Sequence, residues 1–305
     1  MNLRDLDYIC AVAEHKHFGR AAESCHVSQP TLSGQIKKLE AQLGVTLFER
    51  SHKSIRVTDI GQDIIDIAHE ARDAARRIKA VAASAQDPLA GNISLGLIPT
   101  IAPYLIPLFV GKLQTAMPKM SVAYREDITD RLNEALMTGD LDVAVLATPP
   151  EDQSLTAIEL YSEPFWLLFP ENHELGEMKD ASMKDVKEDD ILLLTEGHCF
   201  RDQALSICRP AHKRRRQSLR ATSLETLINL VASGQGVTLV PALAMRGGWS
   251  GELGLSSHEL TDKGAERQIY LTYRRRFPRI EAVKRLAALI QDGLPESVVQ
   301  NKRIS

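Results

Sequence analysis

A run of apolar residues spaced alternately four and three positions apart constrains the fold of this chain more than any other feature. The run consists of Ile60, Ile64, Ile67, Ala71, Ala74, Ile78, Val81 and Ala85. Such spacing predicts one long helix over 59–88 with the apolar seam of a coiled coil. Thr58 is expected to cap its start, and the breaker residues 86–91 are expected to end it. Because a lone helix would leave this seam in water, we expect a homodimer formed through it.

Upstream of that helix, residues 1–58 are predicted to form three helices, over 3–14, 19–24 and 29–42, and then a short basic stretch. Ser28 and Pro30 suit the first turn of the third helix. The pattern indicates a helix-turn-helix whose last helix presents polar side chains to base edges and phosphates. The candidate DNA-contacting residues are Ser28, Gln29, Pro30, Thr31, Ser33, Gln35 and Lys37. The alternative is an ordinary helical hairpin with a solvated face.

The composition is ordinary for a globular protein, with 44% hydrophobic and 25% charged residues among 305. A formal net charge of −3 excludes a protein that coats nucleic acid everywhere, so any DNA contact must come from a local basic surface. The N-terminus carries acidic residues where a signal peptide would be apolar, and no apolar run reaches membrane-spanning length. We therefore expect a cytoplasmic protein without membrane contact, which as a DNA-binding protein would be associated with the nucleoid.

The four cysteines are too few for a disulfide scaffold, and in a reducing compartment a disulfide is more often transient and sensing. Cys10 and Cys25 lie on apolar helix faces and are expected in the core. A zinc site that uses His15, His17 or His26 lacks paired ligand spacing. We expect neither a metal nor a cofactor.

After Gly91 the pattern changes to alternating strands and helices, which predicts an α/β architecture with βαβ units. Strands are expected over 93–97, 121–125, 141–146, 191–194, 236–241 and 268–273. The segments 165–170 and 240–242 are interpreted as crossings between two lobes. Residues 92–163 with 267–305 would form subdomain I, and residues 164–266 would form subdomain II.

Cys199 lies among polar and ionisable neighbours, and Cys208 follows nine residues later. Thiols react with peroxides as thiolates, and His198, Arg201 and a helix N-terminus are groups that favour a thiolate. The spacing indicates a redox switch; the alternative is two unrelated core cysteines. If the segment is helical, the two Cα atoms lie roughly 13 Å apart. A disulfide needs about 4.4–6.8 Å, so its formation would require this segment to refold.

Short motifs between Leu6 and Val57 coincide with those of a known family. They are Phe18, Ala21–Ala22, Ser28–Gln29–Pro30, Leu39–Glu40, Leu43–Gly44, 47–50 and 58–61. The chain thereby resembles LysR-type transcriptional regulators. The resemblance implies a winged helix-turn-helix in which Arg50, Lys53 and Arg56 form the wing. It also implies a C-terminal pair of Rossmann-like subdomains, similar to periplasmic binding proteins, which hold an effector in their cleft.

Further motifs, at 98–105, 196–199, 201–203, Cys208 and 220–227, resemble the hydrogen-peroxide-sensing members of that family. By this resemblance, Cys199 is the peroxidatic cysteine and Cys208 is the resolving cysteine of a reversible disulfide. The residues that line or support the peroxide site would be Thr100, Thr129, His198, Asp202 and Arg267. The resemblance also implies a non-enzymatic activator of oxidative-stress genes. Its partners would be promoter DNA, copies of itself in a homotetramer, RNA polymerase, and a thiol reductant such as glutaredoxin or thioredoxin.

Several alternatives stay open at this level. Thr100 could be a helix N-cap, and His198 with Asp202 could be a loop hydrogen-bond network. The basic run 209–216 could be a solvated loop, or its positive field could lower the pKa of the Cys208 thiol. For the whole chain, the rivals are a LysR regulator that answers a small metabolite and a thiol peroxidase that uses the same two cysteines.

Overall fold

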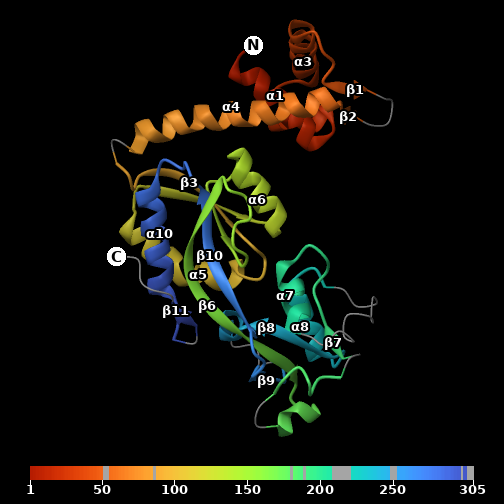
Figure 1. Cartoon of the computed structure of the whole chain (residues 1–305), viewed down its shortest axis with the longest axis vertical. Coiled ribbons are helices and arrows are strands. Elements are labelled where there is room, and N and C mark those ends of the chain that lie inside the picture. Colours follow the sequence, from red (N-terminus) through yellow and green to blue (C-terminus); the bar gives the residue numbers. More distant parts are fainter. Residues whose placement is uncertain are drawn as a thin grey trace. The chain divides into compact units, whose positions relative to one another are not determined.

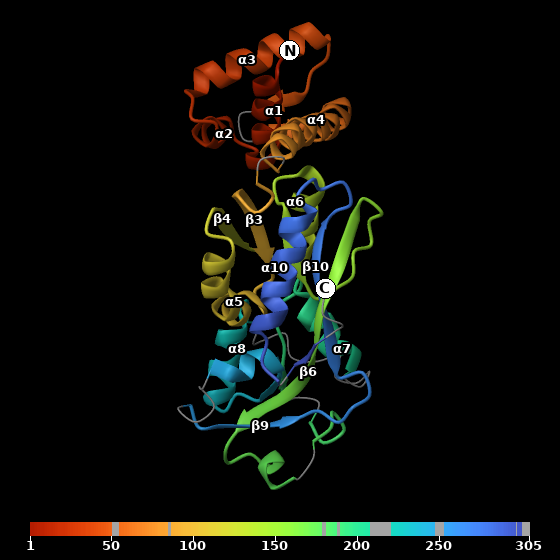
Figure 2. The same cartoon turned by 90° about the vertical axis from the view of Figure 1, so that its left-hand side faces the viewer.

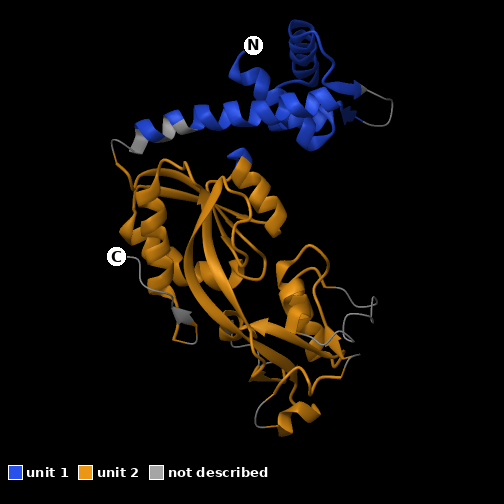
Figure 3. Ribbon diagram, in the orientation of Figure 1, with its two compact units in different colours: residues 1–82, 138–140 blue, residues 83–137, 141–305 orange. Residues whose placement is uncertain are grey.

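The computed structural model describes residues 1–50, 55–84, 87–178, 181–187, 190–207, 221–247, 253–296 and 298–300. The chain divides into two units, residues 1–82 with 138–140 and residues 83–137 with 141–305 (Figure 3). Lys53, Cys208 and the basic run 209–216 lie outside the described residues.

Unit 1 contains the predicted helix-turn-helix and the long helix. Its elements are α1 (Leu3–His15), α2 (Phe18–Ser24), α3 (Gln29–Leu43), β1 (Phe48–Arg50), β2 (Ile55–Val57) and α4 (Asp59–Ser84). Local signals fix the helix starts: Ser28 Oγ accepts a hydrogen bond from the Thr31 amide at 3.3 Å, and Thr58 Oγ1 accepts one from the Gly61 amide at 2.9 Å. Both caps confirm the sequence-based expectation. Gly44 ends α3 with a φ of 72°, a left-handed conformation that glycine adopts at little cost.

The core of unit 1 is formed by the inner face of α3, by α1 and by the start of α4. Leu32, Ile36 and Leu39 of α3 are buried together with Ile65 and Ala68 of α4. The predicted seam of α4 is only partly exposed to solvent in the single chain. Ile60, Ile67, Ile78 and Val81 are 47%, 63%, 72% and 54% exposed. Ile64 and Ala71, which were also predicted for the seam, pack against the core of unit 1.

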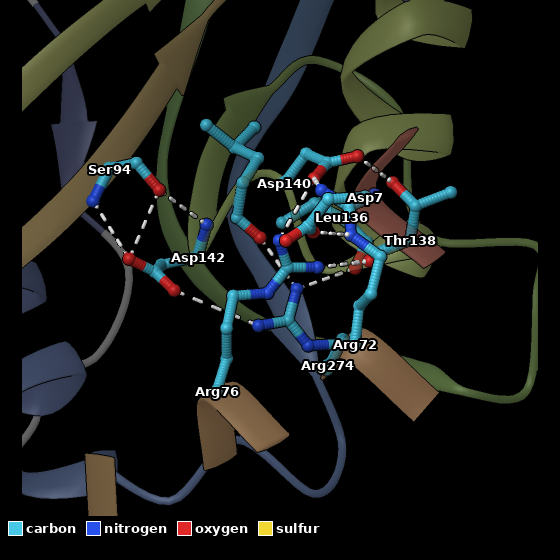
Figure 4. Close-up of polar contacts among 10 residues, drawn as sticks. Asp7, Arg72, Arg76, Ser94, Leu136, Thr138, Asp140, Asp142 and Arg274 are labelled. Atoms are coloured by element: carbon cyan, nitrogen blue, oxygen red, sulfur yellow. Dashed lines mark hydrogen bonds and ion pairs between the residues drawn. The ribbon is translucent and has the colours of Figure 1, made fainter. Parts of the chain in front are cut away.

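Arginines of α4 hold polar groups within unit 1. Arg72 Nε donates to Asp7 Oδ1 at 2.7 Å, which ties α4 to α1 (Figure 4). Arg76 Nη1 donates to Asp140 Oδ1 at 3.0 Å, and its Nη2 donates to the carbonyl oxygen of Thr138 at 2.6 Å.

Unit 2 is an α/β structure, and its elements are labelled in Figures 1 and 2. Its first half contains β3 (Gly91–Leu97), α5 (Ala102–Ala116), β4 (Met120–Glu126), α6 (Thr129–Thr138), β5 (Val143–Leu146), β6 (Leu155–Pro170) and η1 (Glu174–Glu177). Its second half contains β7 (Ile191–Leu192), α7 (Cys199–Ile207), α8 (Leu224–Ala232), β8 (Val237–Pro241), η3 (Ala242–Gly247), β9 (Leu255–Glu259), β10 (Glu266–Arg274), α10 (Ile280–Gly293) and β11 (Val299–Gln300).

The long strand β6 joins two lobes, as Figure 1 shows. In lobe I the strand order is β4-β3-β5-β10-β6, with β3 parallel to β4 and β5 and with β10 antiparallel to both of its neighbours. In lobe II the end of β6 pairs antiparallel with β8 and β9, and β8 runs parallel to β7. The predicted α/β class and the two-lobe regulatory region are thus confirmed, with mixed rather than purely parallel sheets.

Helices cover both lobes. In lobe I, α5 and α10 pack against each other, and α6 lies on the other side of the sheet (Figure 1). In lobe II, α8 packs against β6 and β8. Each lobe therefore has its own apolar core, one around β3 and β5 and the other around β7 and β8.

One of the two predicted crossings is wrong. The segment 165–170 does continue β6 into lobe II, but 240–242 does not return the chain to lobe I, because the following β9 still pairs with β6 in lobe II. The return comes with β10. Ala242 and Leu243 are nevertheless buried against the core of lobe I, which accounts for the apolar character of this segment.

Polar contacts fix the strand ends of lobe I. Asp142 Oδ2 accepts hydrogen bonds from the amide and the hydroxyl of Ser94, at 2.9 and 3.0 Å. Arg274 Nη1 donates to the carbonyl oxygens of Leu136 and Leu141, each at 2.6 Å (Figure 4). These contacts bind the end of α6 to the central strands.

Candidate functional site

Cys199 is the first residue of α7, and its thiol is free and half-buried. The preceding turn uses Gly197, whose φ of 93° lies in the left-handed region. A helix N-terminus carries a partial positive charge, and Cys199 lies at this end of α7. The Arg201 guanidinium is directed elsewhere: it donates to the Leu194 carbonyl oxygen at 3.1 Å and lies 3.9 Å from the Glu196 carboxylate.

His198 is 9% exposed, and this burial lowers the pKa of its imidazole below the ordinary value of 6.5. The ring is therefore neutral at neutral pH. The imidazole therefore does not supply the positive charge that the sequence pattern suggested. It can act on a ligand through hydrogen bonds.

A small space adjoins the Cys199 side chain. We call it the inner pocket; its volume is about 10 Å³, enough for one water-sized molecule. Its lining consists of Ile98, Pro99, Thr100, Ile128, Thr129, Gly197, His198, Cys199 and Phe200. Thr129 is only 8% exposed, and its Oγ1 has no hydrogen-bond partner among the described residues. A buried hydroxyl without a partner is costly, so this atom is ready to bind a small polar ligand.

A buried ion pair supports Thr100, one of the residues that line the inner pocket. Arg267 and Glu163 have fully buried side chains, and Arg267 Nη2 lies 2.8 Å from Glu163 Oε1. The guanidinium also donates to Thr100 Oγ1 at 2.9 Å and to the Thr100 carbonyl oxygen at 3.1 Å. Glu163 Oε2 accepts the Leu243 amide at 2.8 Å, and the guanidinium lies 5.4 Å from the Phe200 ring centre. Arg267 thus supports the pocket without lining it.

The structure changes one sequence-based interpretation and adds one residue to the site. The N-cap of α5 is Ile101 rather than Thr100, whose hydroxyl is instead held by Arg267. Glu163 was not predicted at all, although an acidic residue inside the otherwise apolar stretch of β6 is a signal that could have found it.

A second, larger space also adjoins Cys199. This outer cavity has a volume of about 600 Å³. Its lining consists of Thr129, Asp130, Asn133, Met137, Thr148, Pro149, Glu151, Asp152, Leu155, Gly197, Cys199 and Asp202. Of the five predicted peroxide-site residues, three line the inner pocket, Arg267 supports it, and Asp202 lines only the outer cavity. Their assignment to peroxide stays a prediction.

The candidate DNA-contacting residues lie along α3 and the β1–β2 hairpin. Ser28 caps α3. The exposed residues are Gln29, Pro30, Thr31 and Lys37 of α3, and Arg56 of β2. Ser33 and Gln35 are half-buried, which makes them poorer candidates for base contacts than the sequence suggested. Arg50 ends β1.

The other described cysteines have different surroundings. Both residues were expected in the core. Cys10 is buried there, at 3% exposure, whereas Cys25 is only half-buried. Burial raises the pKa of both thiols and keeps them protonated. Within the described part of the chain, no group of three or more His, Cys, Asp or Glu residues could hold a metal ion. Among those same residues, no helix has the length and apolarity needed to cross a membrane.

Two family models account for most of the chain. Residues 3–62 match the bacterial regulatory helix-turn-helix of the LysR family, and residues 86–295 match the LysR substrate binding domain. The chain belongs to the LysR family. The members of this family are transcription regulators, which agrees with a helix-turn-helix joined to a two-lobe domain.

Among LysR proteins, this chain is similar to regulators named for hydrogen peroxide. It is 42% identical to the Escherichia coli K12 DNA-binding transcriptional dual regulator OxyR over 245 residues, which cover 80% of each chain. It is 38% identical to a Haemophilus influenzae hydrogen peroxide-inducible genes activator, over 96% of this chain and 97% of the other.

Solved structures of OxyR proteins share the fold. Full-length OxyR C199D from Pseudomonas aeruginosa superposes with a TM-score of 0.79 at 35% identity, covering 100% of this chain and 99% of the other. An OxyR cysteine mutant from Corynebacterium glutamicum with H2O2 bound gives a TM-score of 0.63 at 33% identity, covering 96% and 92%.

Proposed function

We propose that this LysR regulator senses hydrogen peroxide through Cys199 and thereby activates transcription of oxidative-stress genes from promoter DNA. The observation that carries the proposal is the inner pocket. It joins a thiol at a helix N-terminus to a buried, unpartnered hydroxyl in a space for one small molecule. The similarity to regulators named for hydrogen peroxide supports the choice of ligand.

In the proposed reaction, the Cys199 thiolate attacks one peroxide oxygen and the O–O bond breaks. The products are a Cys199 sulfenic acid and a hydroxide ion, which takes a proton from solvent to give water. Thr100 and Thr129 orient the peroxide through their hydroxyl groups. The neutral imidazole of His198 donates a hydrogen bond to the departing hydroxide. Asp202 is less suited to this role, because it lines only the outer cavity.

Cys208 then condenses with the sulfenic acid, a disulfide forms and water leaves. The helical conformation of α7 keeps the two cysteines too far apart for this step. Cys199 and Ile207 are its two ends, so their Cα atoms lie about 12 Å apart. One further residue shortens this separation by at most about 3.8 Å. The remaining gap exceeds the 4.4–6.8 Å or so that a disulfide allows. The disulfide therefore requires α7 to unwind, and we propose that this refolding transmits oxidation to the DNA-binding unit.

Hydrogen–deuterium exchange should detect this unwinding. Amides of α7 should exchange faster in the oxidised protein, because the helix loses its backbone hydrogen bonds. Amides of α8, in the same lobe, serve as the internal control and should change little. Equal exchange in α7 of the reduced and oxidised proteins would contradict the proposed transmission.

We propose that the active form is a homodimer through α4 that further assembles into a homotetramer. The exposed part of the α4 seam supports dimerisation, since Ile60, Ile67 and Val81 are exposed and lie multiples of seven residues apart. Two helix-turn-helix units would then contact two half-sites of promoter DNA. RNA polymerase is the expected partner on DNA, and glutaredoxin or thioredoxin would reduce the disulfide.

Substitutions on α3 and β2 test the proposed DNA interface directly. Gln29→Ala or Thr31→Ala should reduce discrimination between promoter and unrelated DNA, by about 1–3 kcal/mol for each base that the variant no longer recognises. Arg56→Ala should weaken binding to all sequences and lower its salt dependence, as expected for a phosphate contact. Gln42→Ala, at the far end of α3, is the control. Fluorescence anisotropy measures the binding. An unchanged sequence preference in both α3 variants would refute the assignment of α3 to base contacts.

A peroxide titration tests the proposed function. The reduced full-length protein should consume one equivalent of hydrogen peroxide per chain and then stop, while Cys208→Ser should accumulate a sulfenic acid at Cys199 that a dimedone-type probe labels. Rapid consumption of many equivalents per chain once an excess of dithiol reductant is added would indicate a thiol peroxidase instead. If stoichiometric peroxide oxidises no thiol, the result would favour a regulator whose effector is a small metabolite.

A further inference from the structure

Cys199 lines two spaces of very different size. The inner pocket has room for a water-sized molecule, whereas the outer cavity has a volume of about 600 Å³. Gly197, Cys199 and Thr129 line both. Any reagent larger than peroxide, such as a small thiol or disulfide, must therefore approach Cys199 from the outer cavity.

The outer cavity is lined by carboxylates. They are Asp130, Glu151, Asp152 and Asp202, all exposed. Carboxylates in water are ionised at neutral pH. For Asp152, hydrogen bonds from Ser154, including its amide at 2.7 Å, lower the pKa further. No Lys, Arg or His is among the described lining residues. The Arg275 guanidinium, close to the same loop, donates to the carbonyl oxygens of Gln153 and Leu155.

The polar groups of the cavity also favour hydrogen-bond donors. Thr129 Oγ1 and Asn133 Oδ1 are buried atoms without partners among the described residues, and they lie one turn apart on α6. Thr129 is the more buried residue, at 8% exposure. An amide oxygen only accepts, so a ligand with N–H or O–H groups would satisfy it, whereas a carboxylate would not.

We infer that the outer cavity selects by charge the reagents that reach Cys199, admitting neutral and ammonium-bearing molecules and repelling anions. This inference rests on the proposed function of Cys199, and it names the class of thiol and disulfide that reacts there. Anionic small thiols and disulfides, such as those bearing several carboxylates, would react slowly with Cys199. A cationic or neutral reagent, or a protein dithiol with a basic surface, would react faster.

Charge-varied disulfides test the inference. Cystamine is a dication, 2-hydroxyethyl disulfide is neutral and 3,3′-dithiodipropionate is a dianion. In each reaction the Cys199 thiolate attacks one sulfur, the reagent's S–S bond breaks and a thiolate leaves, so electrons and atoms balance. The full-length Cys208→Ser protein retains the mixed disulfide at Cys199, which peptide mass spectrometry quantifies against time. The test variant adds Asp130→Asn, Glu151→Gln and Asp152→Asn.

For each disulfide, the rate with the test variant is divided by the rate with its parent, which cancels the intrinsic reactivity of the reagent. At low ionic strength the test variant should react at least about tenfold more slowly with the dication and correspondingly faster with the dianion. The neutral disulfide should change little. A control that carries Glu134→Gln, Glu171→Gln and Glu177→Gln has the same net charge, but none of these residues lines the outer cavity.

A uniform change for all three reagents would overturn the inference, and so would equal changes in the control. The same proteins are also treated with hydrogen peroxide, which is neutral. Failure of Cys199 to form a sulfenic acid there would refute the proposed function. Sulfenic acid formation without charge selection would refute only the present inference.

Discussion

Replacing Cys199 with serine should abolish the transcriptional response to peroxide and leave promoter binding by the reduced protein unchanged. The serine hydroxyl is not a nucleophile towards peroxide at neutral pH, so neither a sulfenic acid nor a disulfide can form at this position. The helix-turn-helix has its own core, formed by α1, α3 and the start of α4, so its fold does not depend on this side chain. Transcription in vitro from a target promoter, with and without peroxide, measures the response.

Cys25→Ser is the matched control for that experiment. Cys25 is half-buried, and its raised thiol pKa keeps it protonated, so its loss should leave the peroxide response intact. A Cys199→Ser protein that still activates transcription at micromolar-scale peroxide would contradict the proposed sensor. Loss of the response in Cys25→Ser would place the reactive thiol in the DNA-binding unit instead.

Removing the buried carboxylate of Glu163 should produce the largest loss of stability. Glu163→Ala leaves the Arg267 guanidinium buried without its ion-pair partner, which costs about 3–5 kcal/mol in the free energy of unfolding. Urea denaturation of the reduced protein measures this loss. Glu159→Ala, an exposed position on the same strand, is the control and should change the stability little.

The role of this ion pair in positioning needs a variant that folds. Thr100→Val keeps both charges and removes only the hydroxyl that accepts from Arg267. It should slow oxidation of Cys199 by peroxide and leave its reaction with a neutral disulfide unchanged, because the disulfide approaches from the outer cavity. Equal slowing of both reactions would indicate a general disturbance of α7 rather than loss of a peroxide-orienting group.

Local patterns in the sequence predicted helices and their caps. They did not predict the contacts between residues that are distant in the sequence. The caps at Ser28 and Thr58 and the long helix α4 follow from spacing and capping signals within a few residues. The resemblance to LysR regulators supplied the two-lobe arrangement, which local periodicity alone does not specify.

The candidate site was predicted only in part, because it is assembled from distant segments. Resemblance pointed to Thr100, Thr129 and His198, which do line the inner pocket. Glu163 escaped, since its partner Arg267 is distant in sequence and meets it only when β6 pairs with β10. The neutral state of His198 also depends on burial, which a sequence motif does not reveal.

Peptide mapping of the oxidised protein tests the central claim most directly. Trypsin cleaves after Arg201, so Cys199 and Cys208 fall in separate peptides. After one equivalent of hydrogen peroxide, non-reducing mass spectrometry of the full-length protein should find these two peptides joined by a disulfide, with Cys10 and Cys25 still alkylatable. Cys199 and Cys208 that both remain as free thiols, or a disulfide through Cys10 or Cys25, would contradict the account.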